Sequence, residues 1–372
     1  MTLSGRQVTI AILAIALIAA GPGGLLGPAG ASSQQTDCSF PVTVTDATGT
    51  EVTIQEEPET VVTLAPSAAQ TMWEIGAEDK VIGVSKRAAY LEGSETRTNI
   101  SGPGYTFVSV EKVVAENPDL VLAPNIIENQ TVQKLRDAGL TVYRFEAATS
   151  LEDVTEKTLR IGEFTGECEG AQERVEEMEA SIEVIRQAVE GEERPTVLYH
   201  LGGGFTAGSE TFIGSIIETA GGTNVAAEAG ITSYAQISSE TVIEQDPQFI
   251  VHPDNARGAM FPDAYNSTTA VAEGNVVSVT DDYMNQPAPR TIQALETMVK
   301  AFHPEAYEAA LAAQQTTTTA TETTTTETST TETTTTPTTT TPPETTDTES
   351  PGLGIVAVGV AVLLVTFIRR YR

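Results

Sequence analysis

One pattern of apolar and polar residues occurs twice in the chain. Residues 110–125 read VEKVVAENPDLVLAPN, residues 239–254 read SETVIEQDPQFIVHPD, and the two stretches align without a gap. Each predicts a short amphipathic helix, a turn at an Asn-Pro or Asp-Pro pair, and a buried strand. A helix that leads into a buried strand is typical of α/β layer domains. Two copies in two halves of one chain predict two similar lobes, with a ligand cleft between them.

The other apolar runs complete the lobes. Apolar and polar residues alternate over residues 42–54 around an Asp-Ala-Thr-Gly turn, which predicts a hairpin. Short apolar runs that end at proline or glycine then alternate with amphipathic stretches, so that each lobe is expected to have a parallel-sheet α/β core. Strands are expected at residues 60–64, 80–84, 141–145, 196–200 and 276–279, and helices at 68–75, 130–138, 212–220 and 289–302.

A helical connector is predicted between the lobes. Ser150 and Asp153 have the spacing of a capping box, and apolar residues recur at steps of three and four from residue 171 to residue 189. This pattern predicts a long, stiff helix, with a break at Gly166 left open. The predicted boundaries are residues 38–149 for the first lobe, 150–194 for the linking helix and 195–313 for the second lobe.

The two ends of the chain have compositions unsuited to a folded core. Residues 1–31 carry Arg6, an apolar run and Ala29-Gly30-Ala31, which predict a signal peptide. Residues 314–350 consist mainly of threonine with glutamate and proline, which predicts an extended stalk. Residues 351–372 hold an apolar run followed by arginines, which predicts a membrane segment. The lobes are therefore expected at the extracellular face of the cell membrane, with a C-terminal anchor.

The C-terminal tail also resembles a known signal. A threonine-rich spacer, Pro351-Gly352, an apolar segment and a basic end resemble the C-terminal sorting signal of halophilic archaeal surface proteins, although Leu353 stands where that motif has phenylalanine. The resemblance implies processing in which a lipid replaces the helix, and it leaves open whether the helix is kept. Three Asn-x-Ser/Thr acceptors for N-glycosylation, at Asn99, Asn129 and Asn266, fit an extracellular location.

Charge excludes one class of partner. The chain has 20 lysines and arginines against 51 aspartates and glutamates, for a formal net charge of −31. Nucleic acid is excluded as a partner, because phosphate contacts need clustered basic residues. The acidity could reflect an acidic binding surface or adaptation to high salt, and the spread of acids along the whole chain favours adaptation to salt.

Candidate catalytic and metal sites fail on their chemistry. Gly203 and Gly208 have the spacing of a phosphate loop, but Ser209 stands where lysine is required. Ser67 lies on a predicted strand-to-helix turn, yet no Gly-x-Ser-x-Gly surrounds it, which favours a helix-capping role. The three histidines, His200, His252 and His303, all fall in the second lobe, so a metal site across the cleft is disfavoured. No catalytic residues and no bound cofactor are predicted.

The two cysteines, Cys38 and Cys168, do not form a Cys-x-x-Cys pair. In an exported chain they are expected to form one disulfide, and two free thiols are the alternative.

Candidate ligand residues follow the predicted strands, because open α/β sheets bind ligands at the carboxyl ends of their strands. Tyrosines suited to stacking on a flat ligand and cations suited to its carboxylates or phosphate occur in these loops. The predicted ligand residues are Ser67, Arg87, Tyr90, Tyr105, Phe205, Tyr234, Tyr283 and Arg290.

Residues 42–302 resemble the substrate-binding proteins of ABC importers for cobalamin, ferric siderophores or haem. The resemblance is carried by Asp46-x-x-Gly49, Val61–Ser67, Ile82-Gly83-Val84, Pro118-Asp119-Leu120-Val121, Ala148-Thr149-Ser150, Phe205-Thr206-Ala207-Gly208 and Pro289-Arg290. It implies that Glu111 and Glu240 dock on the permease dimer, which works with its ATPase. It also makes Tyr90, Tyr105 and Tyr234 counterparts of pocket aromatics, with tyrosine replacing tryptophan at the last two, while Arg87 has no clear equivalent.

The expected function is therefore capture of a bulky metal chelate, with cobalamin first and a ferric siderophore or haem next. The alternative is a surface enzyme or chelatase acting on tetrapyrroles or metal centres. That alternative would be favoured by cysteine or histidine ligands in both lobes, and the first lobe has only Cys38. An adhesin, a third option, would need neither paired glutamates nor cleft aromatics.

Overall fold

The computed structural model of this chain describes residues 38–103, 108–255 and 260–326, with side chains described up to Gln315. The chain divides into two compact units, Met1–Thr319 and Ala320–Arg372. Both lobes lie in the first unit, and of the second unit only the end of one helix is described.

The first lobe is built on a five-stranded parallel sheet in the order β5-β4-β3-β6-β7. Its strands are buried on both faces where they carry continuous apolar runs, as parallel strands under covering helices require. An antiparallel hairpin precedes the sheet, as predicted. The elements are β1 (Val42–Thr45), β2 (Glu51–Ile54), β3 (Val61–Thr63), α1 (Pro66–Glu74), η1 (Glu78–Lys80), β4 (Val81–Val84), η2 (Lys86–Ala88), η3 (Ser94–Thr96), β5 (Thr98–Asn99), α2 (Val110–Glu116), β6 (Leu120–Ala123), α3 (Asn129–Asp137) and β7 (Val142–Arg144).

The second lobe has a four-stranded parallel sheet in the order β10-β8-β12-β13 and an antiparallel pair, β9 and β11. The prediction of two lobes with parallel-sheet cores is confirmed. The elements are β8 (Thr196–Tyr199), β9 (Phe205–Ala207), α6 (Phe212–Thr219), β10 (Thr223–Asn224), α7 (Val225–Glu228), β11 (Tyr234–Gln236), α8 (Ser239–Gln245), β12 (Phe249–Pro253), η4 (Asp263–Ser267), α9 (Thr269–Glu273), β13 (Val276–Val279), α10 (Asp281–Met284) and α11 (Thr291–Phe302).

The repeated stretch forms the same structure in both lobes, α2 followed by β6 and α8 followed by β12. Each helix begins at a serine, Ser109 or Ser238, whose hydroxyl accepts a hydrogen bond from the backbone N–H three residues on. Each ends at Asn117 or Asp246, with φ of 48° and 43°, and these are the non-glycine residues with positive φ among those described. Asparagine and aspartate tolerate this left-handed conformation, and the proline that follows cannot continue the helix.

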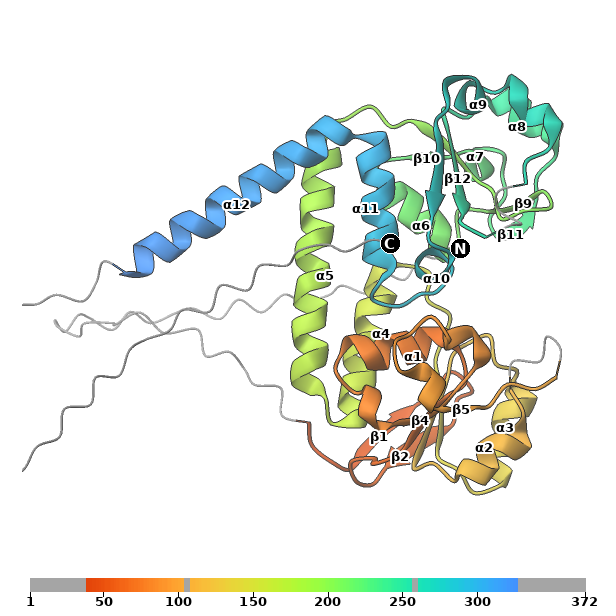
Figure 1. Ribbon diagram of the computed structural model, residues 1–372, viewed down its shortest axis with the longest axis vertical. Helices are drawn as coiled ribbons and strands as arrows, with labels where there is room; N and C mark the ends of the chain where they lie inside the picture. The colour runs from red at the N-terminus through yellow and green to blue at the C-terminus, as the bar shows by residue number, and fades with distance from the viewer. Residues whose placement is uncertain (1–37, 104–107, 256–259, 327–372) are drawn as a thin grey trace, which may run out of the picture. The chain divides into compact units, whose positions relative to one another are not determined.

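The connector consists of two helices, α4 (Leu151–Thr165) and α5 (Cys168–Val189), that pack against each other. Figure 1 shows α5 running along one side of both lobes. The prediction of one long helix is corrected in favour of its break at Gly166, which caps α4 with φ of 80°. Glycine is also required at the contact of the two helices, since a Cβ added to Gly162 would lie 2.4 Å from the Ala171 Cβ. The chain therefore crosses between the lobes as a helical hairpin.

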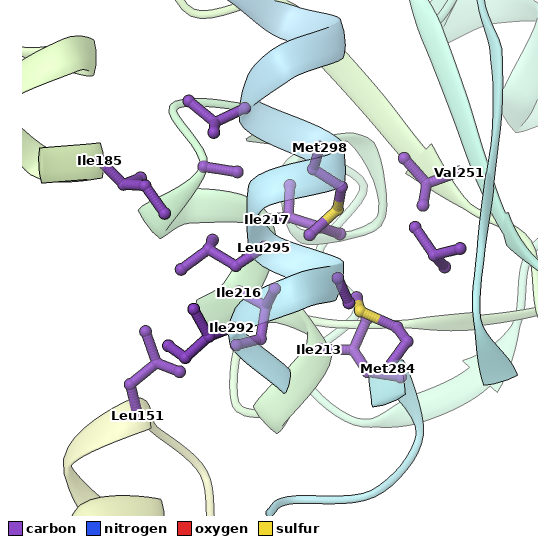
Figure 2. Close-up of a cluster of buried hydrophobic side chains, with 14 of the residues drawn as sticks. Leu151, Ile185, Ile213, Ile216, Ile217, Val251, Met284, Ile292, Leu295 and Met298 are labelled. Carbon is purple, nitrogen blue, oxygen red and sulfur yellow. The ribbon is translucent and has the colours of Figure 1, made fainter. Parts of the chain in front are cut away.

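Both helices of the connector belong to the hydrophobic core of each lobe. In the second lobe, Leu151 of α4 and Ile185 of α5 pack with side chains of α6 and α11, as Figure 2 shows. In the first lobe, Phe164 of α4 and Ala171 of α5 pack under the sheet. Because burying one large aliphatic or aromatic side chain contributes about 1.5–3 kcal/mol, these contacts tie the connector firmly to both lobes.

A disulfide joins Cys38 to Cys168, with their Cα atoms 5.7 Å apart. It links the start of the first lobe to the first residue of α5, across a sequence separation of 130 residues. By closing so long a loop it restricts the unfolded chain.

A further helix, α12 (Pro304–Thr326), follows α11 and was not predicted. The start of the threonine-rich stalk is helical rather than extended, because adding residues to an existing helix is much easier than starting one. Within the described residues, no helix is both long and apolar enough to cross a membrane. The predicted signal peptide and the apolar run 353–368 lie outside the described residues.

Candidate ligand-binding cleft

Two adjoining hollows lie between the lobes, of about 330 Å³ and about 750 Å³. They share Asn125 and Ile126 from the first lobe and Asn285 and Pro287 from the second. Much of their walls comes from segments that follow β3, β4, β6, β7, β8 and β13, at the carboxyl ends of parallel strands, where such sheets bind ligands. The β9–β11 pair and the start of α6 complete the larger hollow. Together the hollows form one cleft suited to a bulky ligand.

The larger hollow has apolar walls that face water. Ile126, Phe205 and Tyr234 line it while keeping 52%, 42% and 51% of their surface exposed, although large apolar side chains are usually buried. In the β9–β11 pair Tyr234 lies opposite Ala207, so that Tyr234 and Phe205 lie diagonally on one face. A flat ligand placed on this face would remove both rings from water.

One side of the smaller hollow is rich in hydrogen-bond acceptors. Asp281, Asp282, Asn285 and Gln286 line its second-lobe side. The Asn285 side chain is held by its neighbours, because the Tyr199 hydroxyl donates to its Oδ1 over 3.1 Å and its Nδ2 donates to Asp281. Burial, and then the nearby charges of Asp281 and Asp254, raise the pKa of Asp282.

Four of the predicted ligand residues line the cleft. Ser67 and Arg87 lie at the smaller hollow, and Phe205 and Tyr234 at the larger. Tyr105 lies outside the described residues. The sequence-based prediction placed the stretch 282–290 at the cleft rim, but it did not single out Asn125, Ile126 or Asp281, which follow β6 and β13 and could have been found from that position.

Three other predicted ligand residues, Tyr90, Tyr283 and Arg290, are described and line neither hollow. The Tyr90 hydroxyl is hydrogen-bonded to Gln286 of the other lobe. Tyr283 packs against the core of the second lobe, with the Arg290 Cζ 6.0 Å from its ring centroid. Arg290 lies in the loop after α10, and it contacts Glu74 and Gln70 of the first lobe.

Charged contacts join that loop to the first lobe and to the connector. Arg290 donates from Nε to the Glu74 carboxylate of α1 over 2.7 Å, and the Arg174 Nε of α5 lies 3.1 Å from the other oxygen of the same carboxylate. Lys157 of α4 donates to the carbonyl of Pro287, a residue that lines both hollows. Contacts that involve α1 and both connector helices, α4 and α5, therefore hold the cleft wall formed by this loop.

The histidines are buried and lie against backbone carbonyls. His200, His252 and His303 lie 3.1, 2.8 and 3.3 Å from the carbonyl oxygens of Met260, Pro253 and Gly221. Among the described residues, no group of three or more histidine, cysteine, aspartate or glutamate side chains is placed to hold a metal ion.

Glu111 and Glu240 lie in equivalent positions, each exposed in the first turn of its helix, α2 or α8. The Ser109 hydroxyl donates to Glu111 Oε2 over 2.9 Å. Hydrogen bonds from its own backbone N–H and from Ser109 lower the pKa of Glu111. Both residues are described, and neither lines the cleft.

Residues 61–283 match the family described as periplasmic binding protein. A cobalamin-binding protein of Halobacterium salinarum is 46% identical over 314 residues, which span 80% of this chain and 85% of that protein. The apo structure of a periplasmic heme-binding protein, RhuT from Roseiflexus sp. RS-1, superposes with a TM-score of 0.60 at 26% identity, covering 68% of this chain and 99% of that one. The vitamin B12-binding protein BtuF of Vibrio cholerae shares the fold, with a TM-score of 0.58 at 22% identity over 68% of this chain and 98% of that one.

Lys157 predicts a pH dependence of stability. Burial lowers the pKa of Lys157 from 10.5 to about 7, so that above this pH the folded chain has lost a proton that the unfolded chain keeps up to about pH 10.5. The free energy of unfolding should therefore rise with pH between these two values. Below the lower value, Lys157 is charged in the folded chain, and the full cost of burying that charge lowers the stability. We expect Lys157→Met to flatten this rise.

Urea unfolding of the wild type and of Lys157→Met at several pH values across this range measures the effect. Lys300→Met is the matched control, since Lys300 is 52% exposed on α11. An equal slope of stability against pH in the wild type and in Lys157→Met would contradict the prediction.

Proposed function

Because this chain belongs to the periplasmic binding protein family and is the substrate-binding component of an ABC importer, we propose that it captures a corrinoid of the cobalamin type. The observation that carries this proposal is the division of the cleft. An apolar face with Phe205 and Tyr234 adjoins the amide and carboxylate side chains of the smaller hollow. These side chains, called the cleft floor below, belong to Asp281, Asp282, Asn285 and Gln286. A corrinoid offers a broad ring edged with primary amides, which match these two surfaces.

Charge argues against the other chelates. Arg87 is the one cationic side chain among the described residues that line the two hollows, and Asp281 and Asp282 line the same hollow as Arg87. Haem propionates and anionic ferric siderophores need cations as partners. The amides of a corrinoid are uncharged and donate N–H groups to carboxylates, so the acidic floor favours them. The 46% identity to a cobalamin-binding protein supports the same ligand.

Haem is the second candidate. The likeness to a heme-binding protein and the exposed phenol of Tyr234, a side chain type that can ligate haem iron, favour it over a siderophore. Neither candidate requires catalytic residues, and the surface-enzyme alternative has no comparable support.

Titration of the purified protein with cyanocobalamin, hemin and a ferric hydroxamate siderophore tests the ligand. We expect cyanocobalamin to bind tightest. Tyr234→Ala should weaken it about 10- to 100-fold, the equivalent of about 1.5–3 kcal/mol for burying one large side chain. Leu159→Ala is the control, because Leu159 is also exposed, at 38%, and lies outside both hollows. Tighter binding of hemin than of cyanocobalamin would contradict the proposal.

We further propose that Glu111 and Glu240 dock on the permease. The repeat gives each lobe one exposed carboxylate at the same place, and a symmetric pair suits a permease dimer that has a twofold axis of its own. Short contacts are needed here, since free charges are screened within about 3 Å at ~1 M salt.

The double variant Glu111→Ala/Glu240→Ala should keep its ligand affinity and lose uptake by cells that carry the importer. Glu116→Ala/Glu244→Ala removes the same charge from the same two helices and serves as the control. Loss of ligand binding would move these glutamates into the cleft, and unchanged uptake would make them ordinary surface acids.

The anchor is proposed to be C-terminal, with residues 1–31 removed as a signal peptide, residues 314–350 as the stalk and residues 351–372 as the membrane or sorting segment. The apolar run and the terminal arginines support this assignment. A chain that stops after Ser350 keeps α12 and the stalk intact and should be released to the medium, while the full chain stays with the cells. Retention of the shortened chain would place the anchor elsewhere.

A further inference from the structure

A chain of hydrogen bonds runs from the backbone of the second lobe, through two side chains of the first lobe, and back to the second-lobe side chains of the cleft floor. It begins at the backbone N–H of Arg290, which donates to Gln70 Oε1 over 2.9 Å. Gln70 Nε2 donates to the Tyr90 hydroxyl over 2.8 Å and to the carbonyl of Asp282 over 3.2 Å. The Tyr90 hydroxyl donates to Gln286 Oε1 over 2.8 Å, and Gln286 Nε2 donates to Asp282 Oδ1 over 3.1 Å.

The direction of every bond in this chain follows from its first member. A backbone N–H can only donate, so the oxygen of the Gln70 amide must face Arg290 and its NH₂ must face Tyr90. The Tyr90 hydroxyl accepts a hydrogen bond from Gln70, so it donates its single proton to the side-chain oxygen of Gln286. The NH₂ of Gln286 is thereby turned to the Asp282 carboxylate. Two amides that could each point either way are left with one orientation.

The part of the chain that lies in the first lobe is protected from water. Gln70 of α1 is fully buried, at 0% exposure, and Tyr90 packs against the core of the first lobe. Burial raises the pKa of Tyr90, which keeps the hydroxyl protonated and able to donate. Reversing either amide would leave a buried donor facing a donor, which costs more than a simple hydrogen bond contributes.

We propose that Gln70 and Tyr90, which do not line the cleft, are positioning residues that orient Gln286 and Asp282 so that the cleft floor accepts hydrogen bonds from the amide N–H groups of the ligand. This inference rests on the proposed corrinoid ligand and adds a source for its selectivity. Asp282, held by Gln286, keeps lone pairs for a donor, while a carboxylate in place of a ligand amide would meet Asp281 and Asp282. The floor therefore selects an amide over the corresponding acid.

Tyr90→Phe removes one hydroxyl and tests the inference. The probes are cyanocobalamin and each of the monocarboxylic acids formed by hydrolysing one of its propionamides. The wild type should prefer the amide to at least one acid by about tenfold or more, as one unpaired or repelled polar group costs about 1–3 kcal/mol. In Tyr90→Phe, we expect cyanocobalamin affinity to fall about 3- to 10-fold and this preference to shrink.

Tyr143→Phe is the matched control, because it removes a hydroxyl from another half-buried tyrosine of the same lobe that lines neither hollow of the cleft. Its affinity and its preference should equal those of the wild type. A merely structural role of Tyr90 would weaken the amide and the acid by the same factor, so the ratio of the two affinities separates the roles.

A double-mutant cycle with Gln286→Ala provides a second measurement. If Tyr90 acts through Gln286, adding Tyr90→Phe to Gln286→Ala should cause no further loss of affinity. Losses that multiply, or an unchanged amide-to-acid ratio in Tyr90→Phe, would overturn this inference alone. A wild-type protein that binds no cyanocobalamin would overturn the proposed function and this inference with it.

Discussion

The arrangement of the molecule depends on the burial of α4 and α5 in two hydrophobic cores at once. Phe164 and Ala171 lie in the core of the first lobe, while Leu151 and Ile185 lie in that of the second. A wide rotation of one lobe against the other would have to pull such side chains out of a close-packed interior. We therefore expect the cleft to be largely formed before a ligand arrives, with movement on binding limited to small adjustments of packed helices.

The parts of the fold that could be predicted from the sequence are those determined by residues close together in the chain. The repeat yielded two lobes because a serine cap, a left-handed Asn117 or Asp246 and a following proline act within a few residues of each other. The pairing of α4 with α5 is less local, since it depends on what the chain does after Gly166. The hydrogen bonds between the lobes, such as that of Arg290 with Gln70, join residues that are 220 positions apart in the sequence. No local sequence pattern predicts them.

The same limit explains the candidate site. Position after a parallel strand placed Ser67 and Arg87 at the cleft, because the carboxyl ends of parallel strands meet at one edge, whereas Phe205 and Tyr234 reach the larger hollow from the antiparallel β9–β11 pair. Position alone could not say which side of a loop a residue occupies. Tyr90 and Arg290 lie on loops that reach the cleft, yet their side chains are used where the lobes meet. Tyrosine and arginine serve both purposes equally well, so residue type does not separate them.

The acidity of the chain gives these short contacts their importance. With 51 acidic and 20 basic residues, the long-range field attracts neither anions nor acidic partners. Recognition must then come from groups within hydrogen-bonding distance, whose strength falls little as salt screens distant charges. The contacts of Glu74 with Arg174 and Arg290 are of this kind, since the three side chains are only 16%, 17% and 22% exposed. We therefore expect the cleft to select its ligand by the local placement of donors, acceptors and charges rather than by the net charge of the chain.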